Sequence, residues 1–306
     1  ERWSTSAAFA DIDNDGDLDL FFTNYVAFSP ANNKKCFSPV GLVDYCTPKA
    51  YQPLPDRLFR NDGNGRFTDI SAASRTGTVR GPGLGVVAFD FDRDGWLDLY
   101  VANDGAANFL WRNRRDGTFE EVALENGVAY GFDGIEQAGM GVDAADYDNS
   151  GKDALIVTNL SGENNNLYLQ DQTGIFTDEV FSSGLAETGY RMTGFGTRFF
   201  DYDHDGLLDL AIVNGAVTII ESQQGTRYPF HQINQLFQNR NGKFTDVTAS
   251  AGPAFQLSEV SRGLATGDLD NDGDLDLLVT NNNGPTRILL NEVANGVPSL
   301  VLRLQG

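Results

Sequence analysis

Short apolar runs recur along the chain, and each follows an acidic segment of nine residues. The runs begin at Leu20, Leu99, Leu155, Leu210 and Leu277, and they are rich in residues that favour β-strands. Runs of small residues, such as STSAAFA and GLGVVAF, precede the acidic segments. A second motif lies between successive copies, with an apolar run, a Gly-bearing turn and a run led by Phe, as in LFRNDGNGRF. This second motif is typical of a β-hairpin.

The pattern of each repeat therefore predicts about four short strands within it. The acidic segments start at residues 11, 90, 146, 201 and 268 and are spaced 55 to 79 residues apart. Four-stranded units at this spacing predict an all-β fold, a β-propeller with five visible blades. We place the blades at residues 1–82, 83–138, 139–193, 194–262 and 263–306. A solenoid is the alternative, although its repeats are usually shorter.

The repeats also predict how the blades pack. The strand nearest the propeller axis is crowded by its counterparts, which explains its Gly and Ala residues. The Phe residues of the second motif are expected to pack between neighbouring blades: Phe67, Phe119, Phe176 and Phe244. The last hairpin, ILLNEVANGVPSLVLRL, keeps two apolar runs but lacks this Phe.

The acidic segments have the pattern of a cation-binding turn. Side-chain oxygens occupy positions 1, 3, 5 and 9, and position 6 is Gly, which tolerates a left-handed backbone. Ca²⁺ binds about six to eight oxygens, and a tight turn directs alternate side chains to one centre. An EF-hand needs Glu at position 12, where this chain has apolar residues in strand-like runs. Asp-Gly turns that only decorate hairpins are the alternative, but four full copies argue against it.

The candidate ligands follow from these positions, with position 7 contributing its backbone oxygen because its side chain varies freely. The full loops supply Asp11, Asp13, Asp15, Asp17 and Asp19; Asp90, Asp92, Asp94, Trp96 and Asp98; Asp201, Asp203, Asp205, Leu207 and Asp209; and Asp268, Asp270, Asp272, Asp274 and Asp276. The third loop supplies Asp146, Asp148, Ser150 and, through its backbone, Lys152. It is degenerate, because Ser150 and Ala154 replace Asp at positions 5 and 9. We expect four strong calcium sites and a weak or empty third; Mg²⁺ is disfavoured because it retains its waters.

Charge and cysteine content narrow the partners and the compartment. The net charge is −21, from 22 basic and 43 acidic residues, which argues against nucleic acid and anionic membranes. No apolar run approaches the roughly 20 residues of a membrane helix, so we expect no membrane insertion. Cys36 and Cys46 form either a disulfide or two free thiols. We favour the disulfide and a secreted or cell-surface location, because loops of modest affinity suit millimolar extracellular calcium.

The sequence favours a non-enzymatic role. Its only histidines are His204, at position 4 of a loop and expected to face solvent, and His231, expected at the surface. No Ser-His-Asp or Cys-His constellation stands out. The alternatives are a lectin-like protein or an enzyme acting on polysaccharide, for which aromatics in an insertion at 25–55 and a segment at 221–232 are candidates. The one sequon, at Asn159, is expected to carry no glycan.

The loops and hairpins resemble FG-GAP/VCBS repeats, which also form the integrin α-subunit propeller. The stretches WSTSAAFADIDNDGDLDLFFTNYVAF, LDLYVANDGAANFLWRN and SRGLATGDLDNDGDLDLLVTN, with YCTP in the insertion, resemble the bacterial cartilage-acidic-protein-like family. This resemblance implies a propeller of seven blades, two of them before Glu1, and an ASPIC/UnbV domain beginning near PSLVLRLQG. It also implies a calcium-stabilised adhesion or assembly scaffold with a protein or glycan partner at the cell surface, or a self-assembling filament subunit.

Overall fold

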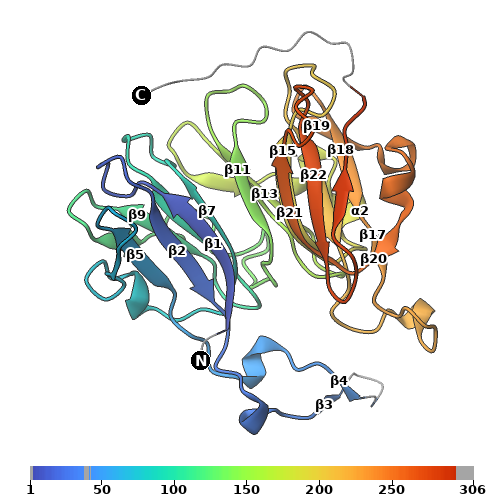
Figure 1. The fold of residues 1–306 in the computed structure, drawn as a ribbon, viewed down its shortest axis with the longest axis horizontal. Coiled ribbons are helices and arrows are strands. Elements are labelled where there is room, and N and C mark those ends of the chain that lie inside the picture. Colours follow the sequence, from blue (N-terminus) through green and yellow to red (C-terminus); the bar gives the residue numbers. More distant parts are fainter. Residues whose placement is uncertain (1–2, 38–40, 42, 294–306) are drawn as a thin grey trace.

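The chain folds into successive antiparallel sheets, each formed from one stretch of sequence (Figure 1). The computed structural model describes residues 3–37, 41 and 43–293. The first three blades contain β1 (Ser4–Ala10), β2 (Asp19–Asn24), β5 (Arg57–Asn61) and β6 (Phe67–Asp69); β7 (Gly83–Phe89), β8 (Asp98–Asn103), β9 (Phe109–Asn113) and β10 (Phe119–Glu121); and β11 (Val142–Ala145), β12 (Ala154–Val157), β13 (Asn166–Gln170) and β14 (Phe176–Asp178). The last two contain β15 (Gly194–Phe200), β16 (Asp209–Asn214), β18 (Gln235–Arg240) and β19 (Lys243–Asp246); and β21 (Ser261–Gly267), β22 (Asp276–Asn281) and β23 (Arg287–Leu289). The prediction of an all-β, five-bladed propeller is confirmed.

Smaller elements lie in the connections within and between the blades. Two short sheets pair β3 (Cys36–Phe37) with β4 (Val43–Asp44), and β17 (Gln232–Ile233) with β20 (Ser258–Glu259). The helical turns are α1 (Val180–Ser183), α2 (Ala186–Gly189), η1 (Pro30–Asn32), η2 (Pro48–Ala50), η3 (Thr76–Thr78), η4 (Glu221–Gln223), η5 (Thr248–Ser250) and η6 (Pro253–Gln256). In the described part of the chain, no helix is both long and apolar enough to cross a membrane. The second apolar run of the last hairpin and the predicted start of an ASPIC/UnbV domain lie outside the described residues.

The first strand of each blade packs against the first strand of the next. This holds for β1 with β7, β7 with β11, β11 with β15 and β15 with β21. A Cβ atom at Gly85 would lie 2.3 Å from the Met140 carbonyl oxygen, and one at Gly141 would lie 1.8 Å from that of Phe195. Backbones of adjacent blades therefore touch at these glycines, which confirms the predicted crowding of the inner strands.

The core lies between blades and is rich in aromatic residues. The predicted packing of Phe119, Phe176 and Phe244 is confirmed, because all three are at most 4% exposed. Phe244, for example, stacks on Tyr147 of the preceding blade with ring centroids 5.1 Å apart. The prediction is wrong for Phe67, which is 42% exposed, because the described chain places no sheet against that side of the first blade.

The insertion at 25–55 joins β2 to β5, at the end of the strands opposite the acidic loops (Figure 1). The predicted disulfide between Cys36 and Cys46 is present, with Cα atoms 5.1 Å apart. An ion pair of 3.0 Å between Lys49 and Glu136 fastens the insertion to the connection that follows the second blade.

Candidate metal-binding loops

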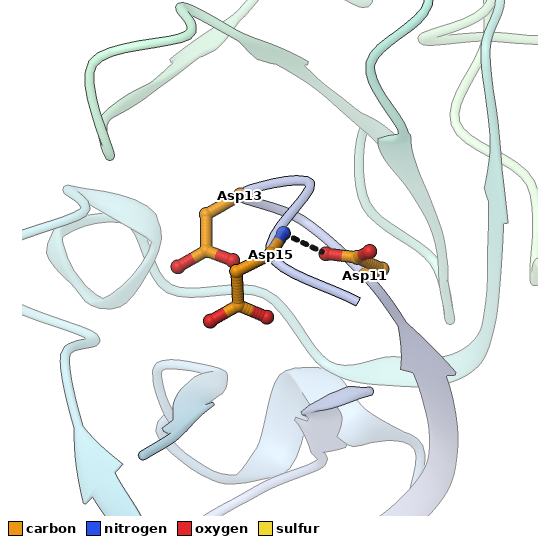
Figure 2. A group of neighbouring side chains, drawn as sticks. All are labelled: Asp11, Asp13 and Asp15. Atoms are coloured by element: carbon orange, nitrogen blue, oxygen red, sulfur yellow. Dashed lines mark hydrogen bonds between the residues drawn. The ribbon is translucent and has the colours of Figure 1, made fainter. Parts of the chain in front are cut away.

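The acidic loop of the first blade connects β1 to β2 and is closed by its own first residue. Figure 2 shows Asp11, Asp13 and Asp15 at this turn, where the Asp15 N–H donates to Asp11 Oδ1 over 3.2 Å. The Gly16 N–H donates to the second oxygen, Oδ2, over 3.0 Å. Carboxylate oxygens of the three aspartates lie within 4.8 Å of one another. The turn thus gathers three negative charges around one centre.

The other four loops repeat this turn. In each, the Asp at position 1 accepts the N–H groups of positions 5 and 6 over 2.7 to 3.2 Å. Positions 4 and 6 have positive φ in all five loops, as the Gly at position 6 led us to expect for that position. Carboxylate clusters of the same size are formed by Asp90, Asp92 and Asp94; Asp201, Asp203 and Asp209; and Asp268, Asp270 and Asp272.

Some carboxylate oxygens of these loops make no hydrogen bond and are free to bind a cation. Oδ1 of Asp13 and Oδ1 of Asp203 are buried and have no hydrogen-bond partner. Burial raises the pKa of the Asp13 carboxyl, and the charges of Asp15 and Asp11 raise it further. The pKa of Asp92 is raised in the same way by burial and by the neighbouring aspartates of its loop. A set of unpaired hard oxygens on a glycine turn fits a bound Ca²⁺ ion.

The aspartate at position 9 is buried beneath the loop and stabilises it by accepting two backbone hydrogen bonds. Asp19 is buried, and its Oδ2 and Oδ1 accept the N–H groups of Ile12 and Asn61 over 3.0 and 2.7 Å. The same pair of bonds holds position 9 of the other full loops: Asp98, Asp209 and Asp276. Burial raises the pKa of both Asp98 and Asp209 to about 7. Direct metal coordination by position 9 stays a prediction, whereas its role in shaping the turn is visible.

Position 7 lies beside the ligand cluster. Its backbone N–H donates to Oδ1 of position 5 in the four full loops, over 2.9 to 3.0 Å. This bond fixes the peptide group that immediately precedes the carbonyl predicted as a ligand. The residues concerned are Asp17, Trp96, Leu207 and Asp274.

The third loop keeps the turn but not the cluster. Among the described residues, the groups of three close acidic side chains do not include Asp146 or Asp148. The Lys152 ammonium group points to the hairpin of its blade, where it donates to the Asp171 carbonyl over 2.6 Å. The prediction of a weak or empty third site is consistent with this arrangement.

A recurring amide, to which the sequence assigned no role, joins each of the first four loops to the following blade. Asn239, at the end of β18, donates its Nδ2 group to the Tyr147 carbonyl of the third loop over 2.8 Å. It also donates to the Leu208 carbonyl of its own blade over 3.0 Å. Equivalent bonds to the preceding loop come from Asn113, Gln170 and Asn291. The available signal was the amide that ends the apolar run in LWRN, LYLQ, LFQN and ILLN.

His204 does not face solvent as predicted. Its side chain is 17% exposed, and Nε2 lies 3.3 Å from Oδ1 of Asp274. The reason is the backbone: φ at His204 is +58°, and the side chain contacts the loop of the next blade. The sequon residue Asn159 is also internal, being 1% exposed, with its Nδ2 group donating to the Asn164 carbonyl over 2.7 Å. This supports the expectation that it carries no glycan.

Comparison with known proteins places these features in a family. The FG-GAP-like repeat matches residues 41–101, 90–157, 146–212 and 218–279. Cartilage acidic protein 1 of Xenopus tropicalis is 27% identical over 314 residues, which cover 94% of this chain and 42% of that protein. The human protein of the same name is 29% identical over 188 residues, covering 60% of this chain and 26% of that protein. The chain spans less than half the length of these curated relatives.

Solved structures show a weaker likeness. A lectin from Agrocybe aegerita that recognises non-reducing terminal N-acetylglucosamine aligns over 94% of this chain and 66% of its own, with 18% identity and a TM-score of 0.47. The repeat matches are more informative, because they cover more than half of the chain and each contains an acidic loop. The expected kinship with cartilage acidic proteins is confirmed, and this chain belongs to the FG-GAP-like repeat family.

Proposed function

We propose that this chain is a calcium-stabilised, non-enzymatic scaffold that works outside the cell and presents a surface to a protein or glycan partner. The observation that carries the proposal is the carboxylate cluster at the same turn of four blades. Like charges held within a few ångströms repel one another unless a cation lies among them. A fold that repeats this arrangement four times therefore favours a bound divalent ion.

The loops explain what the ion would do. Each loop joins the first strand of a blade to the second, and the amide at the end of the third strand anchors it to the adjacent blade. The carboxylates at positions 1, 3 and 5, together with Asp209 at position 9 of the fourth loop, would hold Ca²⁺, and the ion would supply positive charge. The bound ion would therefore make the junction between blades more rigid. A disulfide and loops suited to millimolar calcium support an extracellular location.

A glycan partner is favoured by aromatic side chains at the end of the strands opposite the loops. Tyr45 of the insertion is 74% exposed, and its ring lies 6.2 Å from that of Phe230 in the 221–232 segment. Tyr228, in the same segment, is 50% exposed. Exposed aromatic faces can stack on sugar rings, so loss of glycan binding in Tyr45→Ala, with an unchanged thermal midpoint, would support this candidate.

Thermal unfolding in the presence and absence of a calcium chelator tests the main proposal. At free calcium 100 times Kd, each independent site adds about 2.7 kcal/mol to the free energy of unfolding. We expect the midpoint to fall on chelation and to recover with Ca²⁺ but not with Mg²⁺.

Two variants make this test specific to the loops. Asp272→Ala removes a ligand of the fifth loop and should shrink the calcium-dependent increase of the midpoint. Glu125→Ala removes an equal charge from an exposed residue outside the loops and should leave the increase intact. An unchanged midpoint on chelation of the native chain would refute the proposal.

A further inference from the structure

We infer that the acidic loops bind calcium cooperatively, because the side chain at position 4 of one loop holds the next loop in place. This inference rests on the proposed calcium function. It concerns the coupling between sites, which the carboxylate clusters alone do not imply.

The first and second loops show the contact most simply. Asn14 lies between Asp13 and Asp15, two candidate ligands of the first loop, and its Nδ2 group donates to the Gly95 carbonyl over 3.2 Å. Gly95 is the turn glycine of the second loop and precedes Trp96, whose carbonyl is a candidate ligand. One amide therefore links residues that lie next to candidate ligands of two successive sites.

Other neighbouring loops repeat the contact. Asn149 of the third loop donates to the Gly206 carbonyl of the fourth, again over 3.2 Å. His204 of the fourth loop lies 3.3 Å from the Asp274 carboxylate of the fifth. Asp274 is 3% exposed, and its Oδ2 atom has no hydrogen-bond partner, so this side chain is held between the two loops rather than in solvent.

The backbone explains why position 4 makes this contact. In all five loops its φ lies between +57° and +62°, a left-handed conformation that directs the side chain away from its own turn's carboxylates and is uncommon for residues other than Gly outside turns. An ion that orders positions 3 and 5 also orders the residue between them. The next loop then meets a partner that is already in place and loses less conformational freedom when it binds its own ion. By linkage, the second ion strengthens the first site equally.

The fifth loop provides a matched control. Asn271 occupies position 4 with a φ of +62°, but its side chain makes no hydrogen bond to the described residues. Replacing Asn with Gly removes the amide and still permits positive φ. Asn271→Gly therefore changes the same backbone position without removing a contact between loops.

Calorimetric titration of calcium into calcium-free protein tests the inference, at a temperature where circular dichroism shows each protein to be folded. For the native chain we expect a Hill coefficient above 1. The double variant Asn14→Gly and His204→Gly removes the contacts that join the first to the second and the fourth to the fifth loop. It should bind the same number of ions, with an apparent Kd about three to ten times weaker and a Hill coefficient near 1. Asn271→Gly should match the native chain, and Asn14→Gly alone replaces the double variant if the latter does not fold.

The possible failures can be told apart. If the double variant binds calcium like the native chain and Asn271→Gly, the loops are independent and the inference is wrong, while the scaffold proposal stands. If the native chain binds no calcium, the proposed function fails and the coupling with it.

Discussion

Asp56 is a buried carboxylate, whereas the equivalent position in each of the next three blades is occupied by a neutral Asn. Its Oδ1 accepts the Asn24 N–H at the end of β2 over 2.9 Å, and the residue is 2% exposed. In the following blades the corresponding acceptors are amide oxygens, those of Asn108, Asn165 and Asn234. We predict that Asp56→Asn keeps this bond and stabilises the protein at neutral and alkaline pH.

The magnitude follows from the protonation of Asp56. Burial raises its pKa from 3.8 to about 7, so the folded protein holds the proton more tightly than the unfolded chain does. Protonated Asp56 therefore contributes to the free energy of unfolding. This contribution is fully present below pH 4, is lost as the pH rises through 7, and is absent above that. The gap between the two pKa values corresponds to roughly 4 kcal/mol. The Asn variant does not titrate, so it avoids this loss.

Denaturant unfolding of the native chain and Asp56→Asn, measured side by side from pH 5 to pH 8, checks this reasoning. The advantage of the variant should grow by roughly 3 kcal/mol over this range. Calcium is kept equal in both samples, so titration of the acidic loops cancels in the difference. The reciprocal change Asn108→Asp should destabilise the protein increasingly as the pH rises. A difference that does not depend on pH, or a variant less stable than the native chain at pH 8, would refute the argument.

Two further predictions concern the contacts between blades. Asn239→Ala should lower the free energy of unfolding by about 2 to 3 kcal/mol in denaturant unfolding, because two carbonyls lose their donor. Asn61→Ala removes a single such bond and should lower it less. Equal effects of the two variants would contradict the role assigned to Asn239. Gly141→Ala should lower the free energy of unfolding by about 3 kcal/mol, because the new Cβ would lie 1.8 Å from the Phe195 carbonyl oxygen. Gly267→Ala is the control, because the nearest atom to its new Cβ would be 3.8 Å away, and it should leave the thermal midpoint almost unchanged. A Gly141→Ala variant as stable as the native chain would count against tight backbone packing.

The fold and the turn chemistry could be predicted because they depend on residues close in sequence. The Asp at position 1 closes its turn on the N–H groups four and five residues later, and the Gly at position 6 supplies the backbone conformation. These are local effects of residue type and spacing. The crowded inner strand was also predictable, because Gly and other small residues recur in the run before each acidic loop and indicate that other backbones come close.

Contacts between blades could not be predicted in the same way. A repeat shows that units are equivalent, but it does not show which side chain crosses to the neighbouring unit. Asn239 meets the loop at Tyr147, 92 residues earlier, and His204 meets Asp274 in the following blade. Phe67 matches its counterparts in sequence, yet it is exposed because its side of the blade has no neighbour in the described chain. Such contacts depend on how sheets sit against one another, and that information is not contained in any single repeat.

Two kinds of carboxylate share each full loop, and their burial separates their roles. Positions 1, 3 and 5 are mostly exposed or half-buried, so an ion can reach them, whereas position 9 is buried. The raised pKa of Asp98 and Asp209 means that a negative charge at position 9 is unfavourable without a nearby cation, and an ion bound by the outer carboxylates would offset it. A loop without this buried carboxylate should depend less on calcium. The third loop has that composition, because Ala154 occupies position 9. This composition agrees with the prediction of a weak or empty third site.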